Sequence, residues 1–117
     1  MKKLSTVTAV LVLVMLLSCC WRAIQGANRR GLMRLELGMT MSHVLRVMGT
    51  PDLKEAYRLE KGEALEVLFY YTNRKWGNGN ITKDECTPIV FEAGKLIGWG
   101  DLIYQAKVRV AVEIIRR

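Results

Sequence analysis

The residue types that most often carry chemistry are few in this sequence, and its three cysteines are the most informative of them. Cys19 and Cys20 are adjacent and end an apolar run, whereas Cys86 stands alone after Asp84 and Glu85. A cysteine in such a place can be half of a disulfide, a redox centre or an attachment point for a lipid. No C-x-x-C pair is present, which argues against a redox centre.

The residues before Cys19 favour lipid attachment. Leu16, Leu17 and Ser18 precede Cys19 in the order of a bacterial lipobox, in which a peptidase cleaves before the cysteine and its sulfur receives a diacylglycerol. We therefore predict lipidation of Cys19, which would become the first residue of the mature chain. Several acyl chains, at about 0.8 kcal/mol per buried methylene, make such an anchor effectively permanent. The simpler alternative is that both cysteines are small apolar residues of an export signal.

The N-terminal segment as a whole is typical of export. Residues 4–21 carry no charge, most of them are apolar, and Lys2 and Lys3 precede them. This pattern predicts a signal peptide over residues 1–18. A retained membrane span is the alternative, because eighteen uncharged residues approach the roughly 20 that cross a bilayer. The arginines that follow, from Arg22 onward, argue mildly against export by the positive-inside bias, and a cytosolic chain is the least favoured reading.

The remaining reactive side chains do not form a catalytic or metal-binding set. His43 is the only histidine, and general acid–base catalysis needs a partner and a cleft. Adjacent residues such as Asp84, Glu85 and Cys86 rarely converge on one ion, and a tetrahedral metal site needs further ligands. We expect Asp84 and Lys83 to cap or bridge the end of a loop and Cys86 to be a buried small side chain. The sequence therefore predicts no enzyme, no metal and no cofactor.

The charge of the chain bears on its partners. The formal net charge is +7. In an exported protein this favours an anionic lipid or an acidic partner surface and excludes nucleic acid. A solvated surface of mixed sign explains the charge equally well, because no run of like charges exceeds two. A disulfide between Cys20 and Cys86 stays open, since an oxidising compartment permits it and the sequence does not fix the distance between them.

The 117 residues suffice for one small domain, and its first half is predicted to be helical. A short helix over residues 29–37 follows Asn28 as its cap. A second helix over residues 41–48 has Thr40 as its cap, an apolar stripe at helical spacing, and Gly49 at its end.

The second half is predicted to form strands. Residues 65–72 alternate in the manner of a half-buried strand, and residues 87–92 and 96–99 form two more, joined by a tight turn at Ala93 and Gly94. The loop over residues 73–86 is long enough to suggest a function. Residues 101–117 fit both a helix capped by Asp101 and an alternating strand, and the length and the cap favour the helix.

A small two-layer domain of this kind leaves one sheet face or its edges for another protein. We predict that Leu68, Tyr70 and Trp76 form the partner-binding surface, since aromatic residues are enriched where interfaces concentrate energy. The alternative is that the C-terminal segment covers them, because aromatic rings usually bury.

Two stretches resemble a known family. LELGMTMSHVLRVMGTPD (residues 35–52) is similar to the Gly-Met-Thr and Gly-x-Pro signature of the SmpA/OmlA-type small outer-membrane lipoproteins. VLFYYT followed by TKDECTPIVFEAGKLIGWGD (ending at residue 101) resembles a narrower relative of that group, a domain family without assigned function that usually carries its own lipobox. The resemblance covers roughly residues 28–104. The arginines at 29 and 30 and the tail beyond Tyr104 depart from the pattern.

The resemblance implies an α+β fold with two helices packed on one face of a three-stranded antiparallel meander. The chain would then divide into a signal peptide (1–18), a lipidated tether (19–27), the domain (28–104) and a C-terminal tail (105–117). It also implies a non-catalytic protein anchored by its lipid to the periplasmic face of the outer membrane, with an envelope protein as partner and a role accessory to outer-membrane assembly or envelope maintenance. Inner-membrane anchoring is the alternative location. A periplasmic inhibitor or ligand-binding module, and an enzyme that uses Cys86, are the alternative functions.

Overall fold

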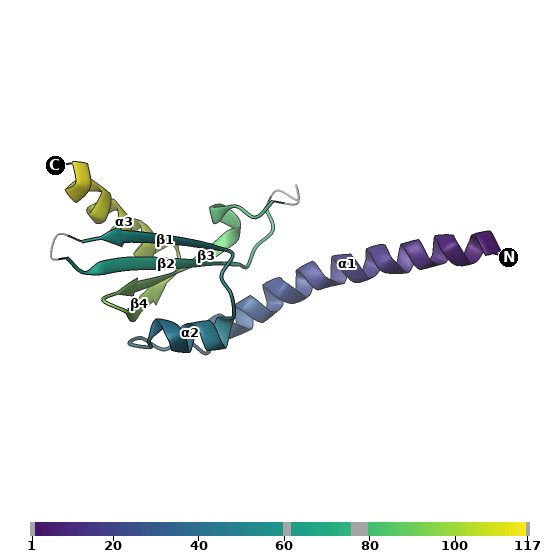
Figure 1. Ribbon diagram of the computed structural model, residues 1–117, viewed down its shortest axis with the longest axis horizontal. Helices are drawn as coiled ribbons and strands as arrows, with labels where there is room; N and C mark the ends of the chain where they lie inside the picture. The colour runs from purple at the N-terminus through teal and green to yellow at the C-terminus, as the bar shows by residue number, and fades with distance from the viewer. Residues whose placement is uncertain (1, 60–61, 76–79, 117) are drawn as a thin grey trace.

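The structure is a computed structural model, and it describes residues 2–59, 62–75 and 80–116. Along the chain the elements are α1 (Lys2–Leu32), α2 (Met41–Met48), β1 (Leu53–Arg58), β2 (Ala64–Tyr71), the 3-10 turn η1 (Lys83–Glu85), β3 (Cys86–Glu92), β4 (Lys95–Trp99) and α3 (Asp101–Arg116). Figure 1 shows a small domain from which most of α1 extends as an isolated rod. The α+β class predicted from the sequence is confirmed.

The sheet is an antiparallel meander of four strands in the order β1-β2-β3-β4, not the three strands predicted. The extra strand, β1, has the polar sequence LKEAYR and lies at the sheet edge, half-exposed or exposed along its whole length. An edge strand of this kind lacks the apolar alternation by which buried strands are recognised. The turn between β3 and β4 is confirmed, with Ala93 at φ 52° and Gly94 at φ 78°.

The opposite edge of the sheet is covered. Backbone hydrogen bonds join Gly38 N to Leu96 O and Leu96 N to Met39 O, each 2.8 Å long. Thr40 and Lys95 form an isolated bridge. The segment between α1 and α2 therefore protects β4, and β1 is the edge strand that pairs on one side only.

Helices cover both faces of the sheet, so the domain has three layers and not two (Figure 1). On one face, α2 and the segment after α1 pack on the even-numbered side chains of β2, in a core of Leu35, Val44, Met48, Leu68, Tyr70, Ile89, Phe91 and Leu96. On the other face, α3 packs on the odd-numbered side chains, in a core of Leu65, Val67, Phe69, Tyr71, Cys86, Val90 and Ala111. The tail is thus a helix, as favoured, and β2 is buried on both sides.

The bounds and both caps of α2 are as predicted, although Leu45 of the predicted apolar stripe is exposed. The side chain of Thr40 accepts a hydrogen bond from His43 N at 3.3 Å, and Gly49 ends the helix at φ 80° with its N–H bonded to Leu45 O. Gly31 allows α1 to cross α2 closely, because a Cβ there would lie 2.5 Å from the sulfur of Met48.

The first helix differs most from its prediction. It is one continuous helix from Lys2 to Leu32, which includes the predicted tether and ends five residues before the predicted limit of residue 37. Asn28 does not cap a helix but lies inside this one. The segment after it turns at residues 33–34, which brings Leu35 into the core at 6 % exposure.

Candidate functional site

The apolar half of α1 is the largest exposed hydrophobic feature among the described residues. By length and composition the stretch Ser5–Leu32 qualifies as a membrane span, and a signal sequence near the N-terminus passes the same test. Eighteen helical residues rise about 27 Å, close to the roughly 30 Å of a hydrocarbon core. None of this apolar stretch is buried against the domain. The exposed side chains are those of Val7, Val10, Leu11, Val12, Leu13, Val14, Met15, Leu16 and Leu17.

The end of α1 is attached to the end of β2. Asn28 Nδ2 donates a hydrogen bond to Tyr71 O at 2.7 Å, and Arg29 Nε donates one to Thr72 O at 2.8 Å. Two side chains of one helical turn therefore hold the last backbone carbonyls of a core strand. The sequence indicated neither contact, because the partners lie 43 residues away.

The predicted cysteine sites are far apart. Cys20 is exposed on α1 and Cys86 is buried, and both are free thiols. Cys86 pairs with Tyr71 across the sheet, and Tyr71 is held by Asn28. Cys20 precedes Asn28 by eight residues, about 12 Å along the helix axis, whereas a disulfide requires Cα atoms within about 7 Å. The two do not form a disulfide in this conformation. The side chain of Cys19 lies outside those described.

The environment of Cys86 keeps its thiol protonated. The side chain is 6 % exposed, as expected for a packed residue. Burial raises the pKa of the thiol to about 12, and the nearby carboxylates of Asp52 and Glu85 act in the same direction. A thiolate nucleophile at this position would need a lowered pKa and access to solvent.

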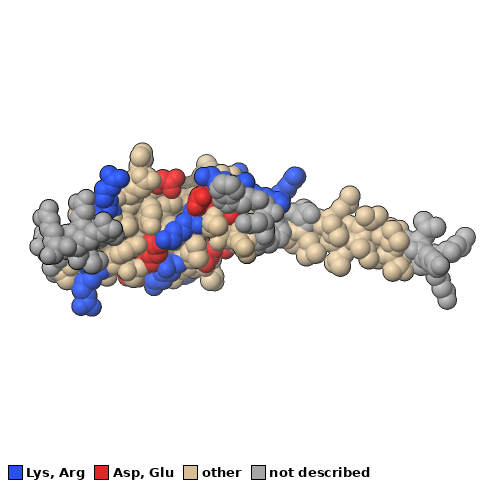
Figure 2. All heavy atoms as spheres, turned by 90° about the horizontal axis from the view of Figure 1, so that it is seen from above, with Lys and Arg blue, Asp and Glu red and all other residues tan. Residues whose placement is uncertain are grey.

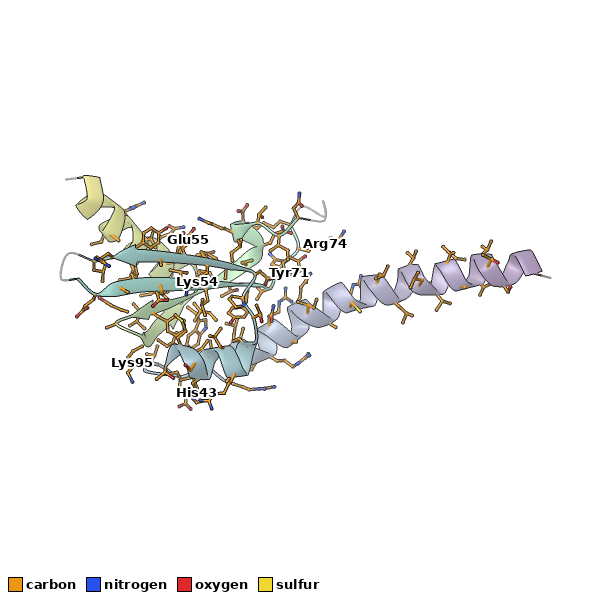
Figure 3. The ribbon with its side chains drawn as sticks, viewed as in Figure 1. His43, Lys54, Glu55, Tyr71, Arg74 and Lys95 are labelled. Carbon is orange, nitrogen blue, oxygen red and sulfur yellow. The ribbon has the colours of Figure 1, made fainter. Side chains whose placement is uncertain are left out.

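A polar cluster around Glu55 joins three elements on the α3 side of the sheet (Figure 3 labels Glu55). Its Oε2 accepts hydrogen bonds from the hydroxyls of Tyr57 and Tyr104, each at 2.8 Å. Its Oε1 pairs with the ammonium of Lys83 from η1. The Lys83 ammonium also lies 5.8 Å from the ring centroid of Phe69. The Glu55 carboxylate thus binds β1, η1 and α3 to one another, and burial raises the pKa of Tyr104, with Tyr57 contributing further.

The stretch Asp84-Glu85-Cys86 has a structural role. Glu85 is 2 % exposed, and its Oε1 accepts from the backbone N and the hydroxyl of Thr82, which makes a capping box. Its Oε2 accepts from Lys75 N at 3.0 Å. The predicted bridging by Lys83 is confirmed, while Glu85 takes the capping role expected of Asp84. Within residues 2–59, 62–75 and 80–116, no group of three His, Cys, Asp or Glu side chains could hold a metal ion.

A shallow pocket of about 250 Å³ lies beside the Glu55 cluster. Two lysines, two aspartates and an aromatic wall line it, so it offers no single charge preference. Its lining residues are Phe69, Lys75, Lys83, Asp84, Asp101, Tyr104 and Gln105. His43 lies on the exposed side of α2, away from this pocket (Figure 3).

Two of the three predicted partner-binding residues are buried. Leu68 is 1 % exposed and Tyr70 is 0 % exposed, both beneath the α1 and α2 layer. The Tyr70 hydroxyl donates to Gly49 O at 2.7 Å, and burial raises the pKa of Tyr70 to about 12. The prediction was wrong because it assumed that the even-numbered face of β2 was open. Trp76 lies outside the described residues.

Comparison with protein families identifies one match. The family model described as "Protein of unknown function (DUF3192)" matches residues 10–106, more than four fifths of the chain, so the chain belongs to this family. The match begins inside the apolar half of α1 and ends inside α3, and it therefore joins the apolar segment to the folded domain. Neither the curated proteins nor the solved structures gave a match.

Proposed function

We propose that this member of the family is a non-catalytic interaction module held at a membrane by its N-terminal segment. The carrying observation is that the apolar half of α1 projects from the domain and packs against none of it. Leaving so many apolar side chains in water is unfavourable by roughly 1.5–3 kcal/mol for each large one. The two cores on the sheet contain no residue of this half of the helix, so its apolar side chains do not contribute to the packing of the domain.

The attachment we propose is a lipid on Cys19, after removal of residues 1–18. The lipobox order of Leu16 to Cys19 supports it, and so does the resemblance to small outer-membrane lipoproteins. Cleavage there would leave residues 19–27 of α1 as a helical tether of about 14 Å, because Asn28 and Arg29 already bind the domain. The resemblance further suggests the periplasmic face of the outer membrane as the location, an envelope protein as the partner, and outer-membrane assembly or envelope maintenance as the process.

A pair of adjacent cysteines supplies the test and its control. We expect Cys19→Ala to remain unprocessed or to leave the membrane fraction, and Cys20→Ala to be cleaved and acylated as the native chain is. Membrane fractionation and intact mass measure both properties. A Cys19→Ala protein of unchanged mature mass in the membrane would refute the lipid anchor. An uncleaved native chain without acyl mass in the membrane would refute it too and would make α1 a retained span.

A ligand-binding or inhibitory module is the second candidate, favoured by the pocket beside the Glu55 cluster. Purification in mild detergent separates the two functions. A stable association with a large envelope complex supports the first, whereas a soluble enzyme or a bound small molecule as the partner would replace it with the second.

A further inference from the structure

The meander brings four chain segments to the end of the domain where α1 enters. Because neighbouring strands are antiparallel, one end of the sheet contains the start of β1, the end of β2, the start of β3 and the end of β4. Asn28 and Arg29 fix α1 to this end through Tyr71 and Thr72. The helix α3 begins here as well, where Gly100 N donates to Pro88 O. We call this part of the domain the anchor end (Figure 1).

Arginines line the side of the anchor end that meets α1. Arg22, Arg29 and Arg30 lie at i, i+7 and i+8, which places them on one face of the helix. Arg29 contacts the end of β2 from this face, and Arg74 follows that strand by three residues. All four side chains are exposed, and none takes part in the ion pairs among the described residues. Figure 2 shows basic side chains where the uncharged length of α1 meets the domain, and Figure 3 shows Arg74 at the same end of the domain.

The guanidinium of Arg30 points back toward the apolar segment. Its Nη1 lies 3.3 Å from the position that a Cβ would take at Gly26. Because Gly26 has no side chain, the guanidinium of Arg30 can lie at the level of Gly26, one turn closer to the N-terminus than its own Cα. This level is four residues, or about 6 Å along the helix axis, from Arg22. In the lipidated chain Cys19 lies at the bilayer surface, three residues before Arg22. The level of Gly26 is seven residues, or about 10 Å along the axis, from Cys19, which is close to the roughly 8 Å over which charges act at physiological salt.

The acidic side chains of the anchor end offset only part of the positive charge on the α1 side, where one carboxylate faces four arginines. Asp52 accepts a hydrogen bond from Tyr71 N through its Oδ2. Asp84 and Asp101 lie by the pocket on the α3 side of the sheet. Apolar side chains complete the surface: Trp99 at the end of β4 is 37 % exposed and Leu102 at the start of α3 is 89 % exposed. A tryptophan and basic residues at the same end of a domain are typical of surfaces at a membrane interface.

We propose that the anchor end docks on an anionic bilayer surface, where Arg30 and Arg74 bind phospholipid phosphates and Trp99 enters the interface. Guanidinium groups suit this ligand because their paired N–H donors match two phosphate oxygens. The inference rests on the proposed membrane tether and adds to it a fixed orientation of the domain. The tether of residues 19–27 would then lie along the bilayer surface and not stand upright from it, with the β3–β4 turn at the other end of the domain.

The test uses the mature protein extracted from membranes and reconstituted in vesicles, with Trp99 as reporter after Trp21→Phe and Trp76→Phe. Vesicles contain brominated phosphatidylcholine, with or without phosphatidylglycerol. We expect quenching of Trp99 to be strong with phosphatidylglycerol and weak without it, and to fall as salt is added. Arg30→Gln with Arg74→Gln should lower the ratio of docked to undocked domain about 30-fold, since each basic residue near the surface contributes about fivefold. Arg58→Gln with Lys95→Gln, at the far end, is the matched control and should change nothing.

Flotation of the same samples separates this inference from the tether. Chain that does not float with vesicles refutes the proposed tether. If the protein floats but Trp99 is not quenched, the docking proposal is wrong and the tether stands. The same holds if Trp99 is quenched equally in both lipids and in both variant pairs. Loss of a co-purifying acidic protein from the Arg30 and Arg74 variant, with no lipid dependence of quenching, would assign the arginines to a protein partner and likewise overturn it.

Discussion

The thiol of Cys86 offers a quantitative check of how the domain is packed. A chain with Cys19→Ala and Cys20→Ala keeps Cys86 as its one cysteine, so that modification reports this position alone. We predict that a maleimide modifies Cys86 slowly in the folded chain and rapidly after unfolding. The side chain is 6 % exposed and its pKa is raised to about 12 from 9.0.

The size of the effect follows from the thiolate fraction. At pH 8 a thiol of pKa 9.0 is about one-tenth ionised and one of pKa about 12 about one ten-thousandth, a ratio of about 1,000. A more basic thiolate is intrinsically more nucleophilic, with a Brønsted coefficient of about 0.45, so the Cys86 thiolate reacts roughly 20-fold faster than a thiolate of pKa 9.0. Ionisation alone therefore slows the reaction about 50-fold, and exclusion of the reagent by the α3 layer slows it further.

The assay compares initial rates of mass increase at pH 8 in buffer and in urea that unfolds the chain. The unfolded chain is the internal control, because reagent and residue are the same. A folded rate within about fivefold of the unfolded one would refute the packing described for Cys86 and would reopen a thiol-dependent activity. A Cys20–Cys86 disulfide in native chain isolated without reductant would contradict the separation of the two cysteines.

Two further predictions concern stability. Glu55→Gln removes the ion pair to Lys83 and weakens the hydrogen bonds from Tyr57 and Tyr104, so the free energy of unfolding in urea should fall by about 1–3 kcal/mol. Glu63→Gln is the exposed control and should stay within about 0.5 kcal/mol of the native chain; equal losses in both would show that the cluster adds nothing. The pKa values of Cys86 and Tyr70, raised by burial from 9.0 and 10.0 to about 12, mean that the unfolded chain loses these protons first. Stability from this source is therefore intact below about pH 9 and falls as pH rises toward 12, by up to about 1.4 kcal/mol per pH unit for each group. Unfolding free energies that stay constant from pH 8 to 11 would contradict the burial of both side chains.

The sequence identified the elements whose ends carry local signals. Thr40 and Gly49 bound α2 because capping acts within one turn, and the Ala93-Gly94 turn is equally local. The strand β1 was missed because an edge strand can be polar on both faces. The length of α1 was underestimated because the helix continues through residues 19–27, where no cap or break stands.

Long-range contacts explain the errors about the site. Leu68 and Tyr70 looked available because alternation in β2 does not reveal that α3 and α2 cover opposite faces. The Glu55 cluster joins residues up to 49 positions apart, and no spacing in the sequence brings Tyr104 to Glu55. Helical spacing does place Arg22, Arg29 and Arg30 on one face of α1, but their position against Arg74 depends on the end of β2.

The central claim is that a compact domain is tied to a bilayer through its N-terminal segment. The most direct test is the intact mass of the native protein extracted from membranes, with fragmentation of its N-terminus. The account predicts a chain that starts at Cys19 and carries diacylglycerol and an amide-linked acyl group. A chain that retains Met1, carries no acyl mass and is recovered in the soluble fraction would contradict it.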